Sequence, residues 1–489
     1  MRLTDLLVGN QWNSMEITGP TDAQITGLTA DSRHVKPGFL FAAFHGEVVD
    51  GRAFIPDAIA RGARAILAPR GTARPENSEG IVFLASDLAR RDYAVMTARY
   101  WGDQPETIAA VTGTNGKSSV ADFTRQLWDI VGQPAASLGT LGLVSPAGTE
   151  NGGLTTPDAS SLSQTLARLA KEGVDHLAVE ASSHGLDQYR LDGVAFSIAA
   201  FTNLSRDHLD YHESMAAYRA AKRRLFAELL TPGGTAVLNA DDQTYEALRS
   251  VVAERGCRIY SYGREGEDIR LLNSSAAASG QALRLKVCGR SHDIFLPLIG
   301  SFQVANALCA LGIVLASGTP AAAAVAALAS LNGVRGRMEL AGRHRNGAEV
   351  YVDYAHTPDA LRAALAALRP RTEGDLHVVF GCGGDRDQEK RHEMGAIAHA
   401  MADQVIVTDD NPRSESPAAI RQAILAACPS ALDMADRQRA ILWAVSHLSP
   451  GDLLLVAGKG HEQGQLAQNR TIPFDDVTVC RDALAGASE

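Results

Sequence analysis

Short apolar runs that end in clusters of polar residues recur through the middle and the last third of this chain. The runs in the middle are TIAAV, HLAV, FSIAAF and TAVL, and those in the last third are EVYV, LHVVF, QVIV and LLLV. Continuous β-rich runs that alternate with alanine- and leucine-rich helical stretches are typical of parallel strands covered by helices on both faces. We therefore predict α/β domains with doubly wound parallel sheets. Ligands of such sheets bind at the carboxyl ends of the strands, where the polar clusters fall.

The length of the chain predicts more than one domain. A chain of 489 residues exceeds what a single hydrophobic core supports, and about three domains are expected. The segment RYWGDQP (99–105) marks the end of a small N-terminal α/β unit, and the glycine-rich segment LNGVRGRMEL (331–340) has the composition of a hinge. We predict domains at residues 1–100, 101–334 and 335–489.

Charge and cysteine content exclude several classes of protein. A formal net charge of −10 argues against a general nucleic-acid binder, because such proteins need an excess of lysine and arginine. The six cysteines show no CxxC or CxxH spacing, which argues against a zinc site or a disulfide framework. No signal-like N-terminus and no apolar stretch of membrane-spanning length is present. We expect a soluble cytoplasmic protein without nucleic-acid partners and without membrane insertion.

The stretch AAVTGTNGKSSV (109–120) has the features of a phosphate-binding loop. A strand that ends in glycines before a helix offers backbone N–H groups and the positive end of the helix dipole to a phosphate. Lys117 would reach the β- and γ-phosphates, and the Ser118 hydroxyl would bind Mg²⁺. The strict pattern GxxxxGK[ST] has glycine where this chain has Val111, so an ordinary strand–helix turn that contains a lysine is the alternative. The apolar run and the matching hydroxyl favour a nucleotide site.

A second set of polar residues bears on the type of reaction. Glu180 ends the run HLAVE, His208 lies in NLSRDHLDYH, and Lys222 lies in the helical stretch AAYRAAKRRLF. Mg²⁺ prefers oxygen ligands, so Glu180 and Ser118 together suit one ion. Lys222 becomes a ligand only if its amine carries CO₂ as a carbamate, which converts a cation into an anion. From spacing alone, the favoured interpretations are a solvated face of a basic helix for Lys222 and a hydrogen-bonded core histidine for His208.

Ordered motifs along nearly the whole chain resemble those of the Mur ligases. The motifs are GTNGKSS (113–119), EASSHGLDQYR (180–190), NLSRDHLDYH (203–212), AAYRAAKRRLF and GSFQVANALCALG (300–312), followed by GRME and DYAHTPDAL. Mur ligases are ATP-dependent, amide-forming enzymes of peptidoglycan precursor synthesis and are related to folylpolyglutamate synthetase. The resemblance implies a small N-terminal domain that binds a UDP-muramoyl substrate, a central P-loop domain that binds ATP, and a C-terminal Rossmann-like domain that binds an amino acid.

The resemblance also implies functional residues and cofactors, which are ATP, Mg²⁺ and a CO₂-derived carbamate on Lys222. The implied ATP site consists of Gly113, Thr114, Asn115, Gly116, Lys117, Ser118, Ser119, Asn306, Arg337 and Asp353. The implied metal site consists of Ser118, Glu180, His208 and Lys222 as its carbamate, and the implied catalytic residues are Lys117, Lys222, His208 and Glu180. Gln303 stands where the family usually has asparagine.

Within the family, the chain resembles the enzymes that add the third residue of the muramoyl peptide. The segment TADSRHVKPGFLFAAFHGEVVDGRAFI is similar to their UDP-binding domain. The implied contacts with the UDP-muramoyl dipeptide are Ser32, Glu47, Val48, Val49, Thr155, Thr156, Ser182, Gln188 and Arg190. Leu154 stands where related sequences often have asparagine.

The stretch DDNPRSESP (409–417) concerns the choice of amino acid. Meso-diaminopimelate differs from lysine by a second carboxylate, which Arg413 could bind through two parallel N–H bonds, a geometry that lysine cannot reproduce. The alternative is an ordinary Asn-Pro turn with a solvated arginine. The form DNPR is found in diaminopimelate-adding ligases, and the resemblance implies a site of Arg386, Asp410, Asn411, Pro412, Arg413, Gly458 and Glu462. Arg386 would hold the α-carboxylate, and Glu462 would hold the distal ammonium.

These motifs lead to an expected function with its alternatives. We expect a monomeric ligase that uses ATP to add meso-diaminopimelate to UDP-N-acetylmuramoyl-L-alanyl-D-glutamate through an acyl phosphate. Because water would destroy the acyl phosphate, we expect the C-terminal domain to close about the hinge near residues 333–336. The alternatives are a lysine-adding or other ligase of the family and, from a different class, a P-loop nucleotide switch. The sequence contains no guanine-specific NKxD segment that would favour the switch.

Overall fold

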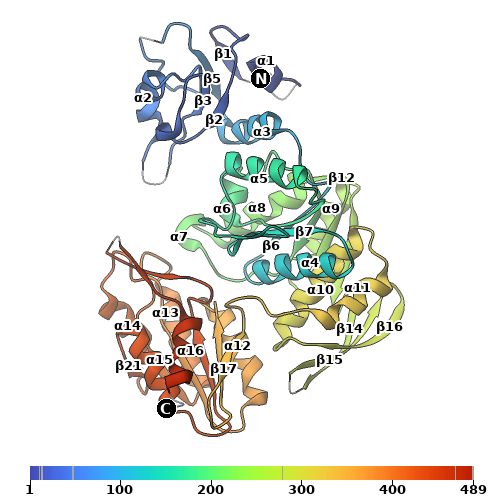
Figure 1. The fold of residues 1–489 in the computed structure, drawn as a ribbon, viewed down its shortest axis with the longest axis vertical. Helices are drawn as coiled ribbons and strands as arrows, with labels where there is room; N and C mark the ends of the chain where they lie inside the picture. Colours follow the sequence, from blue (N-terminus) through green and yellow to red (C-terminus); the bar gives the residue numbers. More distant parts are fainter. Residues whose placement is uncertain are drawn as a thin grey trace. The chain divides into compact units, whose positions relative to one another are not determined.

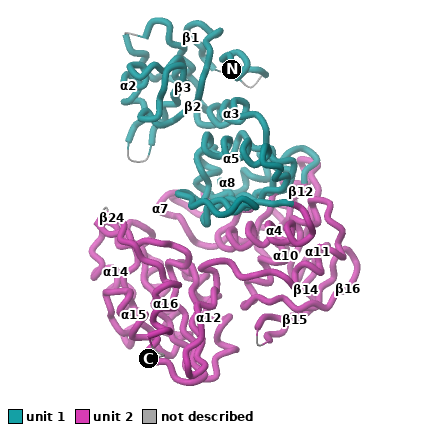
Figure 2. The backbone as a smooth tube through the Cα atoms, in the orientation of Figure 1, with its two compact units in different colours: residues 1–110, 134–198, 221–234 teal, residues 111–133, 199–220, 235–489 magenta. Residues whose placement is uncertain are grey.

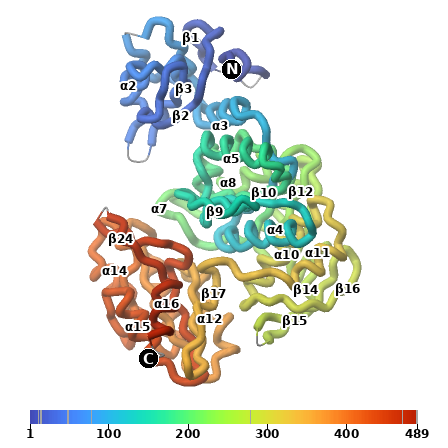
Figure 3. The backbone as a smooth tube through the Cα atoms, viewed as in Figure 1, coloured from blue at the N-terminus to red at the C-terminus, as the bar shows by residue number. Residues whose placement is uncertain are grey.

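The computed structural model describes residues 1–9, 12, 15–46, 49–76, 78–277, 279–468 and 470–486. The chain divides into two compact units (Figure 2). Unit 1 comprises residues 1–110, 134–198 and 221–234, and unit 2 comprises residues 111–133, 199–220 and 235–489. Figures 1 and 3 show the course of the chain from the N-terminus to the C-terminus. The domain boundaries given above stay a prediction.

The N-terminal part of unit 1 is a five-stranded sheet with the strand order β1-β5-β4-β3-β2. Its strands are β1 (Glu16–Thr18), β2 (Gly27–Thr29), β3 (Phe39–Ala42), β4 (Ala65–Pro69) and β5 (Val82–Ser86). Its helices are α1 (Leu3–Leu6), α2 (Ile55–Ala60) and α3 (Ala89–Trp101). Alternate residues of a strand point to opposite faces, so Leu40 packs in the hydrophobic cluster that contains Ala94 of α3, and Phe41 packs in the cluster that contains Ala58 of α2. The predicted N-terminal α/β unit is therefore a sheet buried on both faces.

The longest sheet has eleven strands in the order β16-β15-β14-β13-β12-β11-β6-β10-β7-β8-β9. The strands are β6 (Thr107–Thr112), β7 (Ala135–Gly139), β8 (Gly142–Ser145), β9 (Gly148–Glu150), β10 (His176–Glu180), β11 (Phe196–Phe201), β12 (Leu230–Asn239), β13 (Arg258–Gly263), β14 (Ile269–Ala277), β15 (Gly280–Val287) and β16 (Arg290–Leu296). The predicted runs TIAAV, HLAV, FSIAAF and TAVL are strands β6, β10, β11 and part of β12.

The edges of this sheet are antiparallel, which the apolar runs did not predict. Strand β8 pairs antiparallel with β7 and β9, and β15 pairs antiparallel with β14 and β16. Along β15, buried and exposed residues alternate, because only one face of that strand is covered. A search for continuous apolar runs finds strands buried on both faces and passes over such alternating ones.

The helices that accompany the long sheet include the one that follows the phosphate-binding loop. They are α4 (Lys117–Ile130), α5 (Ala159–Lys171), α6 (Ser183–Asp187), α7 (Leu209–His212), α8 (Met215–Arg224), the π-helical turn η4 (Leu225–Leu229), α9 (Tyr245–Glu254), α10 (Ser301–Ala316) and α11 (Ala321–Ala327). Helices α4 and α10 pack against each other within unit 2 (Figure 1). Most residues of α10 are buried, so this helix is part of the core rather than a surface element.

The C-terminal part of unit 2 is a six-stranded sheet with the order β17-β18-β22-β19-β20-β21. Its strands are β17 (Glu339–Arg343), β18 (Glu349–Asp353), β19 (Leu376–Phe380), β20 (Gln404–Val407), β21 (Leu432–Asp433) and β22 (Leu453–Ala457). All neighbouring pairs are parallel except β17 with β18. The helices are α12 (Pro358–Leu368), α13 (Glu389–Met401), α14 (Pro417–Leu425), α15 (Arg437–Ser446) and α16 (Asp476–Gly486), and a hairpin is formed by β23 (Gly464–Ala467) and β24 (Arg470–Pro473).

Helices cover both faces of the C-terminal sheet. One hydrophobic cluster joins the sheet to α12, α13 and α14, and a second joins it to α15 and α16. The predicted doubly wound α/β class is confirmed. Within the described ranges, no helix combines the length and the apolar character that a membrane crossing requires.

A buried ion pair joins the starts of α15 and α16. Arg437 donates from Nε and Nη2 to the two carboxylate oxygens of Asp476 at 2.8 and 2.7 Å, and Nη2 also donates to the Ala457 carbonyl at 2.8 Å. The two side chains are 1% and 0% exposed. The pair therefore connects both helices to the carboxyl end of β22.

We expect Asp476→Ala to lower the free energy of unfolding by about 3–5 kcal/mol, because it leaves the Arg437 guanidinium buried without its counter-ion. Urea unfolding of the full chain measures the loss. Arg335→Ala is the control, since Arg335 pairs with Asp475 but is 51% exposed, and it should cost at most about 1 kcal/mol. Equal losses in both variants would contradict a special role for the buried pair.

Candidate active site

The loop between β6 and α4 can accept only glycine at two positions. Gly113 and Gly116 have φ angles of +148° and +89°. A Cβ atom at Gly113 would overlap with the Thr202 hydroxyl, and one at Gly116 would overlap with the Asn306 side chain. Because α4 begins at Lys117, the N–H groups of its first turn point out of the helix end. The loop thus has the geometry of an anion-binding site.

The side chains at the start of α4 are held by their own loop and by the C-terminal part of unit 2. Lys117 Nζ donates to the carbonyls of Gly113 and Thr114 at 3.0 and 2.8 Å. The Ser118 hydroxyl is buried and accepts a hydrogen bond of 2.9 Å from Arg337 Nη2. Ser119, the next residue of the predicted site, is also buried. The structure therefore brings Arg337 to the phosphate-binding loop.

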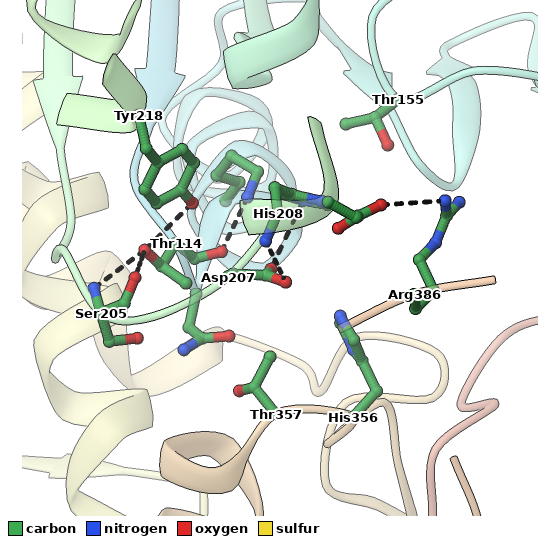
Figure 4. A network of polar contacts seen from close by, with 12 residues as sticks. Thr114, Thr155, Ser205, Asp207, His208, Tyr218, His356, Thr357 and Arg386 are labelled. Atoms are coloured by element: carbon green, nitrogen blue, oxygen red, sulfur yellow. Dashed lines mark hydrogen bonds and ion pairs between the residues drawn. The ribbon is translucent and has the colours of Figure 1, made fainter. Parts of the chain in front are cut away.

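A network within unit 2 braces the loop (Figure 4). The Thr114 hydroxyl lies 3.1 Å from the Tyr218 hydroxyl and donates to the Ser205 carbonyl at 3.1 Å. The backbone N–H of Asn115 donates to Asn203 Oδ1 at 3.0 Å. Sequence reasoning missed Tyr218 and Asn203, and the only signal was their place in the two recognised motifs that follow β11.

The residues predicted to lie on the nucleoside side form a second connected group. Asn306 Nδ2 donates to Gln303 Oε1 at 3.0 Å, and Gln303 Nε2 lies 3.4 Å from the Arg337 carbonyl. Gln303, which stands where the family usually has asparagine, therefore bonds to Asn306 and to Arg337, two of the predicted ATP residues. The Arg337 guanidinium lies 4.3 Å from the centre of the Tyr354 ring. Tyr354 was not predicted.

Asp353 ends β18 with a buried carboxylate that accepts a hydrogen bond of 2.7 Å from the backbone N–H of Met338. Burial raises the pKa of Asp353 from 3.8 to about 6, although the nearby charge of Arg337 acts in the opposite direction. Once it has lost its proton, the group can accept hydrogen bonds from a ligand at both oxygens.

His208 is the N-cap residue of α7 and has a left-handed backbone, with φ of +53°. Its Nε2 lies 3.4 Å from Asp207 Oδ2, and its side chain is 35% exposed. The interpretation of His208 as a core histidine is therefore wrong. Burial would raise the pKa of Asp207, but the neighbouring positive charges, His208 first among them, lower it to about 2. Asp207 is thus an anion that orients His208.

In unit 1, the buried carboxylate of Glu180 lies at the end of β10. It accepts hydrogen bonds from the Thr140 backbone N–H at 2.8 Å and from the Thr140 hydroxyl at 3.2 Å. The Thr140 hydroxyl lies 3.1 Å from the Thr155 hydroxyl. The Thr156 hydroxyl donates to the Glu180 carbonyl at 2.7 Å and lies 2.9 Å from Ser182 Oγ. Predicted metal and substrate residues are therefore neighbours here.

Arg190 extends this group toward the predicted muramoyl site. Its guanidinium donates to the Thr156 carbonyl at 2.8 Å and to Gln188 Oε1 at 2.7 Å. Ser182 caps α6 by accepting from the Gly185 backbone N–H at 3.0 Å. Leu154 is 54% exposed beside these residues in the sequence. Thr155, Thr156, Ser182, Gln188 and Arg190 thus form one connected set.

Lys222 lies on α8 and is 2% exposed. The interpretation of this lysine as part of a solvated helix face is wrong, whereas the adjacent Arg223 is exposed as that interpretation required. The π-helical turn η4 follows α8 directly, and turns of this kind occur frequently at functional sites.

The N-terminal predictions are only partly within the described residues. Ser32 begins a short 3-10 turn (Ser32–His34) that Asp31 caps through the Arg33 backbone N–H. Val49 is exposed. Glu47 and Val48 lie outside the described residues.

The DNPR loop (residues 410–413) follows β20, and two of its residues have a left-handed backbone. Asn411 and Arg413 both have positive φ angles, of +42° and +52°. Asp410 and Asn411 are buried, and Arg413 Nη1 donates to the Gly384 carbonyl at 2.8 Å. Burial lowers the pKa of Arg413, and the charge of Arg386 adds to that effect. Arg413 is not the solvated arginine of an ordinary turn.

A second loop, which follows β22, meets the DNPR loop. Glu462 Oε2 accepts from Asn411 Nδ2 at 2.7 Å, and Glu462 Oε1 lies 3.4 Å from the Tyr354 hydroxyl. Burial raises the pKa of Glu462, as does the charge of Asp410, while Lys459 acts in the opposite direction. A Cβ atom at Gly458, where φ is +117°, would overlap with the Asp410 carboxylate. The structure brings Asp410, Asn411, Gly458 and Glu462 together.

Arg386 lies on the loop after β19 and is paired with another part of unit 2 (Figure 4). Its Nη1 lies 3.3 Å from Asp210 Oδ2 of α7. Arg206, which precedes α7, pairs with Asp387 at 3.0 Å and with Glu389 at 2.5 Å. These ion pairs were not predicted, because no local sequence pattern links residues so far apart in the chain.

Two of the four residues predicted to hold Mg²⁺ fit that ion by chemistry as they stand. In the described part of the chain, no three or more histidine, cysteine, aspartate or glutamate side chains cluster as a metal site. Mg²⁺ does not need such a cage, since it commonly binds one or two carboxylates, substrate phosphates and water. The Glu180 carboxylate and the Ser118 hydroxyl supply oxygen ligands of the required kind.

Family models match the chain in three successive segments. The model "Mur ligase family, catalytic domain" matches residues 24–110, "Mur ligase middle domain" matches residues 111–314, and "Mur ligase, glutamate ligase domain" matches residues 336–460. The chain belongs to the Mur ligase family. Enzymes of this family are ATP-dependent ligases that form amide bonds, so the nucleotide-switch alternative is wrong.

Two relatives and two solved structures show which members of the family this Mur ligase is similar to. It is 52% identical over 472 residues to the UDP-N-acetylmuramoyl-L-alanyl-D-glutamate–2,6-diaminopimelate ligase of Caulobacter vibrioides, covering 95% of this chain and 96% of that one. The enzyme of the same name from Rhizobium meliloti is 50% identical over 489 residues, covering 99% and 100%. A solved structure of a ligase with that name is 32% identical, with a TM-score of 0.72 and coverage of 100% and 99%. MurF ligase from Thermotoga maritima, solved in complex with ADP, shares the fold at 19% identity, with a TM-score of 0.63 and coverage of 95% and 97%.

We expect the pH dependence of stability to report the buried Asp353. Its raised pKa means that the folded chain binds this proton more tightly than the unfolded chain, so stability from this group falls as pH rises from about 4 to about 6. Asp353→Asn removes the titrating carboxyl group and, with it, this pH-dependent contribution to stability. The free energy of unfolding of the variant, relative to the wild type, should therefore rise by up to about 3 kcal/mol between pH 4 and pH 7. Urea titrations at both pH values measure it, and a difference that does not vary with pH would contradict the assignment.

Proposed function

We propose that this Mur ligase uses ATP to join meso-2,6-diaminopimelate to UDP-N-acetylmuramoyl-L-alanyl-D-glutamate in peptidoglycan precursor synthesis. The observation that carries the function is the identity of 50–52% over nearly the whole chain to ligases with this name. The half-buried Arg413 in the DNPR loop supports the choice of the amino acid, because an arginine at this place matches a second carboxylate.

The reaction requires an activated acyl group. The side-chain carboxylate of the D-glutamyl residue attacks the γ-phosphorus of ATP, the bond to the β-phosphate oxygen breaks, and an acyl phosphate and ADP result. The unprotonated amine of diaminopimelate then attacks the acyl carbon, phosphate leaves, and the amine proton passes to solvent. Three anionic groups approach one another in the first step, so the main task of the protein is positioning and charge neutralisation.

The nucleotide site carries out this task with residues of unit 2. The N–H groups of residues 113–119 would hold the phosphates, and Lys117, which now bonds to its own loop, would turn to the γ-phosphate. Arg337 fixes the Ser118 hydroxyl. Asn306 would hold the adenine, and Asp353 would accept hydrogen bonds from the ribose.

The metal would be held by Ser118, Glu180, His208 and the carbamate of Lys222. Mg²⁺ bound there supplies positive charge where the carboxylate and the phosphates meet. The backbone strain at His208 and its neighbour Asp207 support a defined orientation of the imidazole. Burial of Lys222 supports a role other than solvation, since a buried lysine requires a partner or a change of charge.

The two remaining substrates would occupy separate sets of residues. The muramoyl dipeptide would contact Thr155, Thr156, Ser182, Gln188 and Arg190, and the uridine diphosphate would contact Ser32 and the loop of residues 47–49. In the amino-acid pocket, Arg413 would bind the distal carboxylate and Glu462 the distal ammonium. Arg386 would exchange its bond to Asp210 for the α-carboxylate of the substrate.

We expect Lys222→Ala to abolish product formation while the thermal unfolding midpoint stays within a few degrees of the wild type. Short carboxylic acids such as formate or acetate should partly restore turnover, because their oxygens can replace those of the carbamate. The measurement is product formation followed by mass spectrometry. Arg223→Ala, an exposed neighbour on α8, is the control and should keep wild-type turnover. Full activity of Lys222→Ala would refute the carbamate.

We expect Arg413→Ala to lower kcat/KM for meso-diaminopimelate at least about a hundredfold, because a buried carboxylate would lose its arginine. The weak use of lysine should change much less, since lysine lacks that carboxylate. Mass spectrometry of the ligated product with a panel of diamino acids tests both the variant and the proposed function. Preference of the wild type for lysine, or equal losses for both amino acids, would overturn the assignment.

A further inference from the structure

One lysine of the amino-acid pocket is fully buried and was not among the predicted site residues. Lys459 lies between Gly458 and Gly460 in the loop after β22, and its side chain is 0% exposed. Its Nζ donates to Asn411 Oδ1 at 2.8 Å and to the Gly464 carbonyl at 2.9 Å. The same atom lies 3.3 Å from Asp410 Oδ1 and 3.8 Å from Glu462 Oε2.

These contacts join two segments of the chain that are far apart in the sequence. Asp410 and Asn411 belong to the DNPR loop, whereas Glu462 and Gly464 follow Lys459 in the loop after β22 and at the start of strand β23. A buried ammonium requires oxygen partners, because burial without them costs several kcal/mol. The segments that supply these oxygens are therefore held around one point.

The ammonium also determines how the Asn411 amide is oriented. Asn411 Oδ1 accepts from Lys459 Nζ and from the backbone N–H of Leu466 at 2.9 Å. With its oxygen engaged by two donors, the amide must direct its nitrogen to the other side, where Nδ2 donates to Glu462 Oε2. Lys459 thus acts on Glu462 both directly and through Asn411.

Strand β23, which Lys459 contacts at Gly464, also holds Arg413, the specificity residue of the proposed function. The backbone N–H of Arg413 donates to the Leu466 carbonyl at 3.1 Å, and the backbone N–H of Gln468 donates to the Arg413 carbonyl at 2.9 Å. Strand β23 and the residue after it are therefore bonded to the DNPR loop at Asn411 and at Arg413. Loss of the ammonium would release β23 at Gly464 and, with it, the support of Arg413.

Glu462 is the more accessible of the two carboxylates beside Lys459. The Asp410 side chain is 7% exposed and lies 3.3 Å from Lys459 Nζ, whereas the Glu462 side chain is 31% exposed and lies 3.8 Å from it. An incoming substrate ammonium would therefore meet Glu462 rather than Asp410.

We propose that Lys459 is a positioning residue for the amino-acid substrate, whose buried ammonium holds Asn411, Glu462 and the Arg413 loop in the geometry that binds a diamino acid. This inference rests on the proposed function only for the identity of that amino acid. Lys459 reaches the substrate through Asn411 and Glu462 and is not itself a catalytic residue.

Two variants of Lys459 test the inference. Lys459→Ala leaves a cavity at a site that favours an ammonium, and Lys459→Met fills the same space without a charge. In both, KM for diaminopimelate should rise at least about tenfold, while KM for ATP and for the UDP-muramoyl dipeptide stays within about threefold. Propylammonium added to the assay should lower KM again in Lys459→Ala, and it should have no such effect in Lys459→Met or in the wild type.

The control is Arg369→Met, which removes a 42% exposed cation of the same sheet domain and should leave every KM unchanged. Thermal unfolding verifies that the variants fold, and if Lys459→Ala does not, the KM comparison in Lys459→Met decides alone. The inference is overturned if Lys459→Met keeps the wild-type KM, or if all three KM values rise together. If the wild type uses a different amino acid, the proposed function fails, and the same comparison with that amino acid still tests Lys459.

Discussion

In the C-terminal sheet, parallel pairing sets Asp353 of β18 opposite Ala457 of β22, and Phe380 of β19 opposite Val407 of β20. The residues that follow these positions therefore emerge at one edge of the sheet, although they lie far apart in the sequence. Asp353, the DNPR loop and the loop with Glu462 all begin there. The predicted nucleotide-side carboxylate and the proposed amino-acid pocket of this Mur ligase depend on that convergence.

Burial of charge is the second constraint. Lys459, Arg437 and Asp410 are almost completely removed from solvent, and each meets oppositely charged or polar partners from another segment. Ion pairs of this kind contribute less to stability than to geometry, because desolvation offsets much of the attraction. The contacts of Lys459 hold two loops at the ends of strands together, and the Arg437 pair holds the starts of α15 and α16 at the end of β22.

Much of the fold could be predicted from the chain. The apolar runs predicted parallel strands and their carboxyl ends, and the ordered motifs led to the family. The antiparallel edge β15–β16 was missed because burial alternates along β15, unlike along a fully covered strand, and the edge β8–β9 was missed because β9 is exposed throughout. The bonds of Arg386 with Asp210 and of Arg337 with Ser118 were out of reach, since they join residues from different parts of the chain.

The sequence by itself determined the α/β class, the glycine positions of the phosphate-binding loop and the residues that resemble a ligase site, since these depend on local pattern and residue type. Only the tertiary structure decided whether a given charged side chain is solvated. Lys222 lies between arginines in a helix that looks basic and exposed, yet it is 2% exposed, and Lys459 in a glycine-rich loop is fully buried. Burial depends on which distant segments cover a residue, and no spacing within the chain encodes that.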